Sequence, residues 1–211
     1  MQHTDWLERW TTGNTRWHKD SVNEDLENFW VPPVEGGRVL VPLCGKSMDV
    51  LWLAERGFDV SGVELSVVAI EGFFSDHGLT YNLETAGALT SYRAVKCPVT
   101  LYCGDYFQFG APKFDALYDR ASLIALDAAL RPAYVRHTQT LLKEDAYQLL
   151  VTLEYDQQLV DGPPYCVMAE EVRAYWPGLR CVREQEALAS CPPKFTEAGV
   201  PQVNEVTWIS K

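Results

Sequence analysis

The chain has 211 residues and a formal net charge of −11, from 18 basic and 29 acidic side chains. Hydrophobic residues make up 47% of it, which is enough for one globular domain with a large core. The basic residues are scattered singly and no apolar run reaches the roughly 18–20 residues that span a bilayer, so we expect neither nucleic acid nor a membrane as a partner.

The chain begins with a polar, charged stretch, MQHTDWLERW, which lacks the apolar segment of a signal peptide and so predicts a cytoplasmic protein. Trp6 and Trp10 lie one helical turn apart and share a helix face. We interpret Trp6 as docking this helix on the core, and Trp10 and Trp17 as a lid over a flat apolar ligand. His18 is a candidate proton acceptor beside the substrate, with a solvent-facing loop histidine as the alternative.

The first strand is predicted over Arg38–Val41, an apolar and β-branched run that follows two glycines. Ser47 is placed to cap a helix that ends near Arg56 and is closed by Gly57. The stretch VPLCGKS forms the turn between this strand and this helix, which is where nucleotide-binding folds hold their ligand.

This turn does not match the glycine patterns that cradle phosphates. A P-loop needs its first glycine at Leu40, and a dinucleotide-binding turn needs three glycines where this chain has only Gly45. A ligand without phosphate, such as S-adenosylmethionine, needs only one glycine for close backbone approach. The second strand, Asp59–Glu64, ends in an acidic residue about 20 residues after the turn, where a ribose acceptor is expected. We therefore predict a cofactor site at Gly45 and Glu64, against the simpler interpretation of a tight turn and a solvated strand end.

The rest of the chain continues the alternation of short apolar runs and helical patterns. A second helix is predicted to begin at Ser66 and to end at Gly78. Further strands are predicted over Val99–Cys103, Phe114–Tyr118, Gln148–Glu154, Arg180–Glu186 and Glu205–Ile209, and further helices over Arg131–Leu142 and Ala169–Trp176. The last two strands are joined by a short, Pro-containing connection without a helical pattern, so we expect them to pair as an antiparallel hairpin.

These elements predict an α/β fold, with a mostly parallel seven-stranded sheet, a terminal antiparallel hairpin and helices on both faces. This Rossmann-like plan is that of class I methyltransferases, whereas pure dinucleotide-binding sheets lack the hairpin. We describe residues 1–211 as a single domain, in which 1–36 form an aromatic-rich cap and 37–211 the catalytic core.

Polar residues follow the third strand in the segment CGDYFQF. Asp105 is placed to accept from the exocyclic amine of an adenine, and Tyr106 to pack on its ring. The alternative is that Asp105 starts an Asx turn and Tyr106 belongs to the core. The tetrapeptide GPPY follows the fifth strand, which is the wrong place for the Asn/Asp-Pro-Pro-Tyr motif of amine methylases and argues against that activity.

Arg120 follows the fourth strand, at the carboxyl edge of the predicted sheet. An arginine is rarely buried there unless its charge is paired. It is therefore a candidate to bind the carboxylate of a cofactor's amino acid, or to orient the substrate. A structural salt bridge to Asp119, Asp127 or Glu64 is the alternative.

The six cysteines contain no C-x-x-C pair and none at zinc spacing from a histidine, so we expect no metal site. In a cytoplasmic protein they are expected to be reduced and mostly buried. A non-catalytic S-adenosylmethionine-binding or redox-responsive module that uses exposed thiols remains an alternative function.

Five segments together resemble the bacterial thiopurine S-methyltransferases: WLERWTTGNTRWH, RVLVPLCGKSMDVLWLAERG, VSGVELS, YDRASL and YDQQLVDGPPY. The resemblance runs from about residue 4 to residue 209, and the pair PLCGKS and GVELS is its most specific part. It implies a class I fold and methyl transfer from S-adenosylmethionine to aromatic or heterocyclic thiols such as thiopurines. Carried over by motif, it implies cofactor contacts at Trp10, Leu43, Gly45, Glu64 and Arg120, adenine-side positions at Asp105 and Tyr106, and a substrate-facing ring at Trp17.

Such a reaction needs no dedicated base, because an aromatic thiol ionises near neutral pH and its thiolate is already a strong nucleophile. We therefore assign no certain catalytic residue and expect a monomer that acts on a small-molecule aromatic thiol. Bacterial members of the family are also linked to methylation of selenium and tellurium compounds, so tellurite detoxification is an alternative role. A substrate loop within 185–204 is left open.

Overall fold

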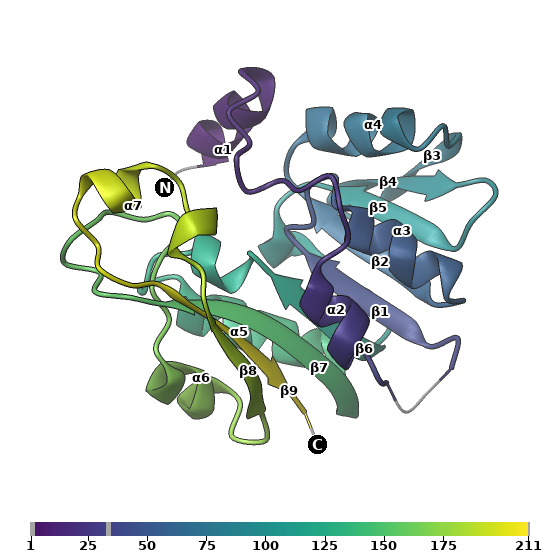
Figure 1. Ribbon diagram of the computed structural model, residues 1–211. Helices are drawn as coiled ribbons and strands as arrows, with labels where there is room; N and C mark the ends of the chain where they lie inside the picture. The colour runs from purple at the N-terminus through teal and green to yellow at the C-terminus, as the bar shows by residue number, and fades with distance from the viewer. Residues whose placement is uncertain (1–2, 33–34, 211) are drawn as a thin grey trace.

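The computed structural model describes residues 3–32 and 35–210, over which the strands form one nine-stranded sheet. In chain order the strands are β1 (Arg38–Pro42), β2 (Asp59–Glu64), β3 (Tyr81–Ala86), β4 (Leu89–Ala94), β5 (Val99–Cys103), β6 (Phe114–Arg120), β7 (Leu142–Glu154), β8 (Arg180–Glu186) and β9 (Asn204–Ile209). Their spatial order is β3-β4-β5-β2-β1-β6-β7-β9-β8 (Figure 1). The strands from β5 to β7 run parallel, while β9 pairs antiparallel with both β7 and β8. The predicted parallel core and terminal antiparallel hairpin are therefore confirmed.

The predicted count of seven strands is wrong, because β3 and β4 add an antiparallel hairpin at the β5 edge. Four consecutive side chains of β3 are exposed, among them the apolar Leu83, and β4 mixes exposed and buried residues, so the hairpin lacks the continuous apolar run of the buried strands. Its rings Tyr81 and Tyr92 pack on Phe74, which lies 7 and 18 positions earlier in the chain. Packing on the neighbouring helix therefore stabilises an edge that the local pattern did not indicate.

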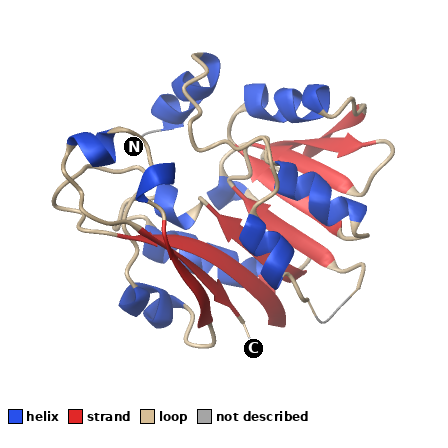
Figure 2. Cartoon of the chain, in the orientation of Figure 1, coloured by secondary structure: helices blue, strands red, loops and turns tan. Residues whose placement is uncertain are grey.

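Helices cover both faces of the sheet (Figure 2). They are α1 (His3–Thr11), α2 (Glu24–Phe29), α3 (Met48–Glu55), α4 (Val67–Asp76), α5 (Arg131–Leu141), α6 (Ala169–Tyr175) and α7 (Lys194–Glu197). The helices α2, α3 and α4 pack in one core cluster, and α5 and α6 in the cluster on the other face. Within the described residues, no helix is both long and apolar enough to cross a membrane. The short helix α7 lies in the β8–β9 connection, where no helix was expected.

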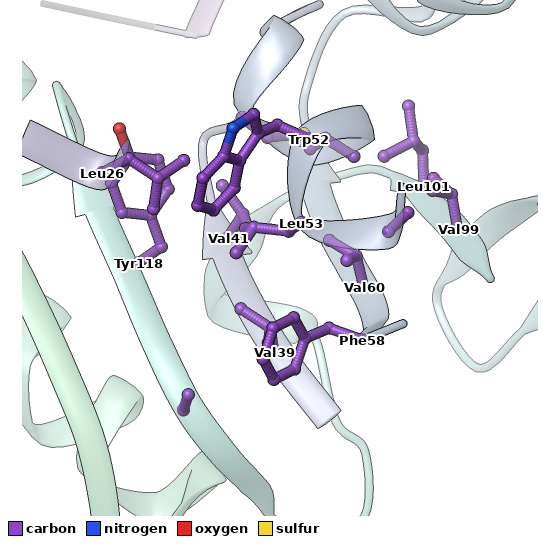
Figure 3. Packing of buried hydrophobic residues seen from close by; sticks show 14 of the residues in the cluster. Leu26, Val39, Val41, Trp52, Leu53, Phe58, Val60, Val99, Leu101 and Tyr118 are labelled. Atoms are coloured by element: carbon purple, nitrogen blue, oxygen red, sulfur yellow. The ribbon is translucent and has the colours of Figure 1, made fainter. Parts of the chain in front are cut away.

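The first core cluster joins α3 to the strands beneath it, and this fixes the start of α3 relative to the sheet. Figure 3 shows Leu53 of α3 beside Val41 and Val60 of β1 and β2, all of them almost fully buried. Ser47 caps α3 by accepting a hydrogen bond from the Asp49 N–H at 3.2 Å, as predicted. The predicted turn before α3 is thus held between a buried strand and a capped helix.

The described residues of the predicted cap over 1–36 differ in their packing. Leu26 and Trp30 of the α2 region belong to the first core cluster. The backbone N–H of Asn23 donates to Oδ1 of the buried Asp49 at 2.8 Å, and the Tyr118 hydroxyl donates to Oδ2 at 2.8 Å. Val22 also packs against this cluster, whereas the described residues before it, in α1 and the turns that follow, contribute none to it.

Gly62 of β2 lies where no side chain fits. An added Cβ atom would lie 2.6 Å from Sγ of Cys44 and 2.6 Å from Cδ2 of Leu101. Both atoms belong to the packed core, and Cys44 is part of the turn between β1 and α3. The close approach of β2 to this turn therefore requires glycine.

We expect Gly62→Ala to lower the free energy of unfolding by about 1–3 kcal/mol, because the added methyl group overpacks the core. Urea denaturation measures this change. The matched control is Gly110→Ala, where the added Cβ meets no atom within 4 Å. A change at position 110 as large as that at position 62 would contradict the steric argument.

Candidate functional site

A cavity of about 670 Å³ lies at the carboxyl ends of the parallel strands, the edge where open α/β sheets bind ligands. The strand-end residues Leu43, Glu64, Gly104, Asp105, Tyr106 and Arg120 line one side of it. The other side is formed by α1 and the turn after it, by Pro163 and Pro164, and by residues of the β8–β9 connection. Figure 1 shows α1 and α7, from opposite ends of the chain, at the same end of the molecule.

The carboxylate of Glu64 joins the end of β2 to the turn after β1. Its Oε2 accepts from the Gly45 N–H at 2.9 Å and its Oε1 from the Ser66 N–H at 2.8 Å. The side chain is buried, and burial raises the pKa of the Glu64 carboxyl, while the hydrogen bonds from Ser66 and Gly45 oppose that rise. Each carboxylate oxygen has a second lone pair, so Glu64 can also accept from the hydroxyls of a ligand in the cavity.

The turn itself adopts a backbone conformation that favours glycine. Leu43 and Gly45 have φ angles of 45° and 54°, and a Cβ atom at Gly45 would lie 3.0 Å from Cζ2 of Trp10. Leu43 is a non-glycine residue in the left-handed region, which is uncommon and costs energy. The glycine thus allows the buried Trp10 ring to pack directly on the turn. Trp10 lines the cavity, whereas Gly45 lines a small hollow beside it.

Arg120 lines the cavity at the end of β6, and Ala121 after it has a φ angle of 71°. Among the described residues Arg120 forms no ion pair, so the alternative of a structural salt bridge is not found. Asp119 instead accepts from the Tyr134 hydroxyl at 2.6 Å and from the Ser122 N–H at 3.2 Å. The guanidinium is therefore available to an anionic group of a ligand.

Three tryptophans form one aromatic cluster over the site. The Trp17 ring meets Trp6 edge-on at a centroid distance of 5.2 Å and Trp10 at 5.8 Å. Trp6 and Trp17 are both half-buried and line the cavity, so the interpretation of Trp6 as a core-docking residue is wrong. The guanidinium of Arg9 lies 5.6 Å from the Trp6 ring centroid and 5.8 Å from that of Trp17.

His18 is not part of the main cavity wall. It lines a small adjoining hollow of about 30 Å³ with Lys46 of the turn, and its Nε2 lies 3.3 Å from Asp20. Burial and then the charge of Lys46 lower the pKa of His18. The turn closed by the His18 N–H to the Thr15 carbonyl directs Trp17 toward the cavity and His18 toward the β1–α3 turn.

Asp105 and Tyr106, which follow Gly104 after the end of β5, both lie in the cavity wall. Both also make the contacts of the alternative interpretation, an Asx turn and core packing. Asp105 Oδ1 accepts from the Phe107 N–H at 3.0 Å in an Asx turn, which leaves Oδ2 for a ligand. The buried Tyr106 shares a hydrogen bond of 2.9 Å with the Thr138 hydroxyl. Tyr106 therefore lines the cavity with a ring whose hydroxyl is already bonded.

Several cavity residues were not predicted. They are Arg9, Arg16 and Lys19 near the lid, Pro163 and Pro164 of the GPPY segment, and Ser190, Cys191, Pro192, Pro193, Lys194 and Glu197 of the β8–β9 connection. The only local signals were the basic residues interleaved with tryptophans and the two Pro-Pro pairs. Which side of a loop faces a cavity depends on tertiary packing, so neither signal was enough to predict that these residues line the cavity.

Comparisons with known proteins give one consistent result. The family model described as thiopurine S-methyltransferase matches residues 1–211. The thiopurine S-methyltransferase of Bordetella petrii is 42% identical over 96% of this chain and 95% of its own length. That of Pseudomonas syringae pv. tomato is 38% identical over 98% of this chain and 97% of its own.

Among solved structures, the Burkholderia thailandensis 1,6-didemethyltoxoflavin-N1-methyltransferase, crystallised with S-adenosylhomocysteine, matches with a TM-score of 0.61. The match covers 99% of this chain and 87% of that one at 15% identity. It confirms the predicted class I methyltransferase fold. At this identity the match concerns the fold and not the substrate.

We expect Gly45→Ala to weaken binding of S-adenosylhomocysteine by about tenfold or more, because the methyl group strains a positive φ and displaces Trp10 from the turn. Calorimetry measures the affinity. Gly57→Ala is the matched control, since its φ is 87° and an added Cβ meets no atom within 4 Å. Equal losses of affinity in both variants would mean that backbone strain alone matters and that the Trp10 contact does not.

Proposed function

Because the chain belongs to the thiopurine S-methyltransferase family, we propose that it transfers the methyl group of S-adenosylmethionine to the sulfur of aromatic and heterocyclic thiols, including thiopurines. The observation that carries this proposal is the Glu64 carboxylate, fixed by the Gly45 N–H at the wall of the cavity. This carboxylate can accept hydrogen bonds from ribose hydroxyls, and the turn beside it lacks the glycine pattern of phosphate-binding turns. The products are a methyl thioether and S-adenosylhomocysteine.

The cavity residues suit each part of the cofactor. Glu64 would accept from the ribose hydroxyls, and Oδ2 of Asp105 from the exocyclic amine of the adenine. Arg120 would pair with the carboxylate of the methionine part, since it has no ion-pair partner within the described chain. Trp10 and Leu43 would cover the turn side of the cofactor.

The chemistry follows from position. The thiol proton passes to water, and the thiolate attacks the methyl carbon in line with its bond to the sulfonium sulfur. As the new carbon–sulfur bond forms, the old one breaks and its electron pair neutralises the sulfonium. Holding sulfur and methyl about 3–3.5 Å apart supplies most of the rate gain. Trp10 and Trp17 would exclude water and hold the flat substrate, so no residue need act as a base.

We also propose that the protein acts as a monomer in the cytoplasm. All six cysteines are free thiols, which suits a reducing compartment. Size-exclusion chromatography with light scattering tests the oligomeric state, and fractionation of the producing cells tests the compartment.

Activity is tested with methyl-labelled S-adenosylmethionine and a panel of thiophenol, 6-mercaptopurine and their oxygen analogues. We expect label on the thiols and none on phenol or hypoxanthine, because only sulfur ionises readily and attacks as a soft nucleophile. A protein that binds the cofactor but labels no thiol would be a binding module and not this enzyme.

Glu64→Gln should weaken S-adenosylhomocysteine binding by about 10- to 100-fold, the range that corresponds to a charged hydrogen bond of about 1.5–3 kcal/mol. The amide also places a donor where both oxygens now accept. Glu205→Gln is the control, since Glu205 lines the same cavity but accepts from Gln185. Unchanged calorimetric affinity in the position 64 variant would exclude the ribose role.

Trp17→Ala should raise the KM for thiophenol by about tenfold, because it removes roughly 1.4 kcal/mol of ring packing. The KM for the cofactor should rise less. Steady-state kinetics with each ligand varied in turn separates the two. Trp17→Phe, which keeps a ring, should recover most of the loss. Equal rises in both KM values would contradict a substrate-facing Trp17.

A further inference from the structure

Two half-buried cations meet at the cavity from opposite ends of the chain. Arg9 belongs to α1 and Lys194 begins α7, and both line the cavity. Neither forms an ion pair with a carboxylate among the described residues. They add to Arg16, Lys19 and Arg120 in the same wall, so positive charge gathers at this cavity in a chain whose net charge is −11.

Both side chains are held in place by uncharged groups, and the negative charge of Asp161 also acts on Lys194. The guanidinium of Arg9 lies near the rings of Trp6 and Trp17. The ammonium of Lys194 donates to the backbone carbonyls of Asp161 and of Pro163, the latter at 3.0 Å. Ring faces and carbonyl dipoles orient a cation without cancelling it. The two charges are therefore pre-positioned, which lowers the entropy cost of binding an anion.

The two cations also repel each other. Burial and then the positive charge of Arg9 lower the pKa of the Lys194 ammonium. An anion placed between them would turn this repulsion into two attractions, so its binding gains more than a single ion pair would give. A neutral ligand leaves the repulsion in place. The cavity thus discriminates in favour of negative charge at this end.

The acidic residues of the wall do not remove this preference. Glu64 is bonded to two backbone N–H groups, and Glu205 accepts from the Gln185 amide at 2.9 Å. Glu197 is exposed on α7, one turn after Lys194, and forms no ion pair within the described chain. The aromatic rings of Trp6, Trp10 and Trp17 line the same cavity and suit a flat ligand with its charge at one end.

We propose that the preferred substrates are aromatic thiols that carry a second, anionic group such as a ring carboxylate, and that Arg9 and Lys194 bind this group between α1 and α7. This inference rests on the proposed function and specifies its substrate class. The carboxylate takes no part in the chemistry: the thiolate still attacks the methyl carbon, and the sulfonium still leaves as a thioether. Its role is to fix the ring so that the sulfur points to the strand ends.

The test compares 4-mercaptobenzoate with its methyl ester, which has the same ring and thiol but no charge. Rates are measured at a pH where both thiols are ionised, so that only the second group differs. For the wild-type protein we expect kcat/KM to be about tenfold or more higher for the acid, with an advantage that shrinks as ionic strength rises.

Arg9→Met and Lys194→Met remove one charge each and keep an apolar chain of similar length. We expect each to lower kcat/KM for the acid by about tenfold while changing that for the ester less than about twofold. Arg9→Lys and Lys194→Arg are the matched controls, because they keep the charge and should keep most of the preference. Lys143→Met, at the exposed Asp115 ion pair outside the cavity, controls for total charge.

The outcomes separate the two proposals. Equal wild-type efficiency on acid and ester, or equal losses on both in the Met variants, would overturn the anion site and leave a purely steric role for these side chains. Failure of the wild-type protein to methylate either compound would instead count against the proposed function. Retained preference in the Arg9→Met, Lys194→Met double variant would also overturn the assignment.

Discussion

The hydrogen bond from the Gly45 N–H to Glu64 is the contact on which the site depends. A buried carboxylate without donors would be costly, and this one is stabilised by two backbone N–H groups from the turn after β1 and the start of α4. The bond ties two neighbouring strand ends into one unit. It also fixes the turn in its left-handed conformation, and the glycine there leaves the space that the Trp10 ring fills. Gly45 therefore contacts both the Trp10 ring of the aromatic cluster and the Glu64 carboxylate at the strand ends.

Much of the sheet could be predicted, because its buried strands are continuous apolar runs and its main helices begin at Ser47 and Ser66, which cap them as expected. The β3–β4 hairpin was missed because an edge strand needs no such run and is stabilised by contacts to α4. For the same reason α7 was missed: four residues after a Pro-Pro pair give no periodicity. A local sequence pattern therefore identifies strands and helices whose own residues are apolar and buried. It does not identify elements that are stabilised by contacts with other parts of the chain.

The site divides in a similar way. Glu64, Gly45 and Arg120 could be placed because strand ends of a parallel sheet meet at one edge whatever the loops do. The orientations of Trp6 and His18 could not, since they depend on how a short irregular segment turns. The two positive charges, Arg9 of α1 and Lys194 of α7, lie 185 positions apart in sequence, so only the folded chain brings them to one cavity.

The bond between Asn23 and the buried Asp49 has a consequence for the lid as a whole. It anchors the chain a short distance after α1, directly on α3, the helix that follows the turn after β1. The segment with Trp6, Trp10 and Trp17 is therefore tethered at Asn23. Its effective concentration at the cavity is set by the short connection to this anchor and not by diffusion. Covering a ligand then costs only the ordering of a few residues. If a second chain supplied these aromatic side chains, forming the same contacts would also cost the entropy of association between the two chains.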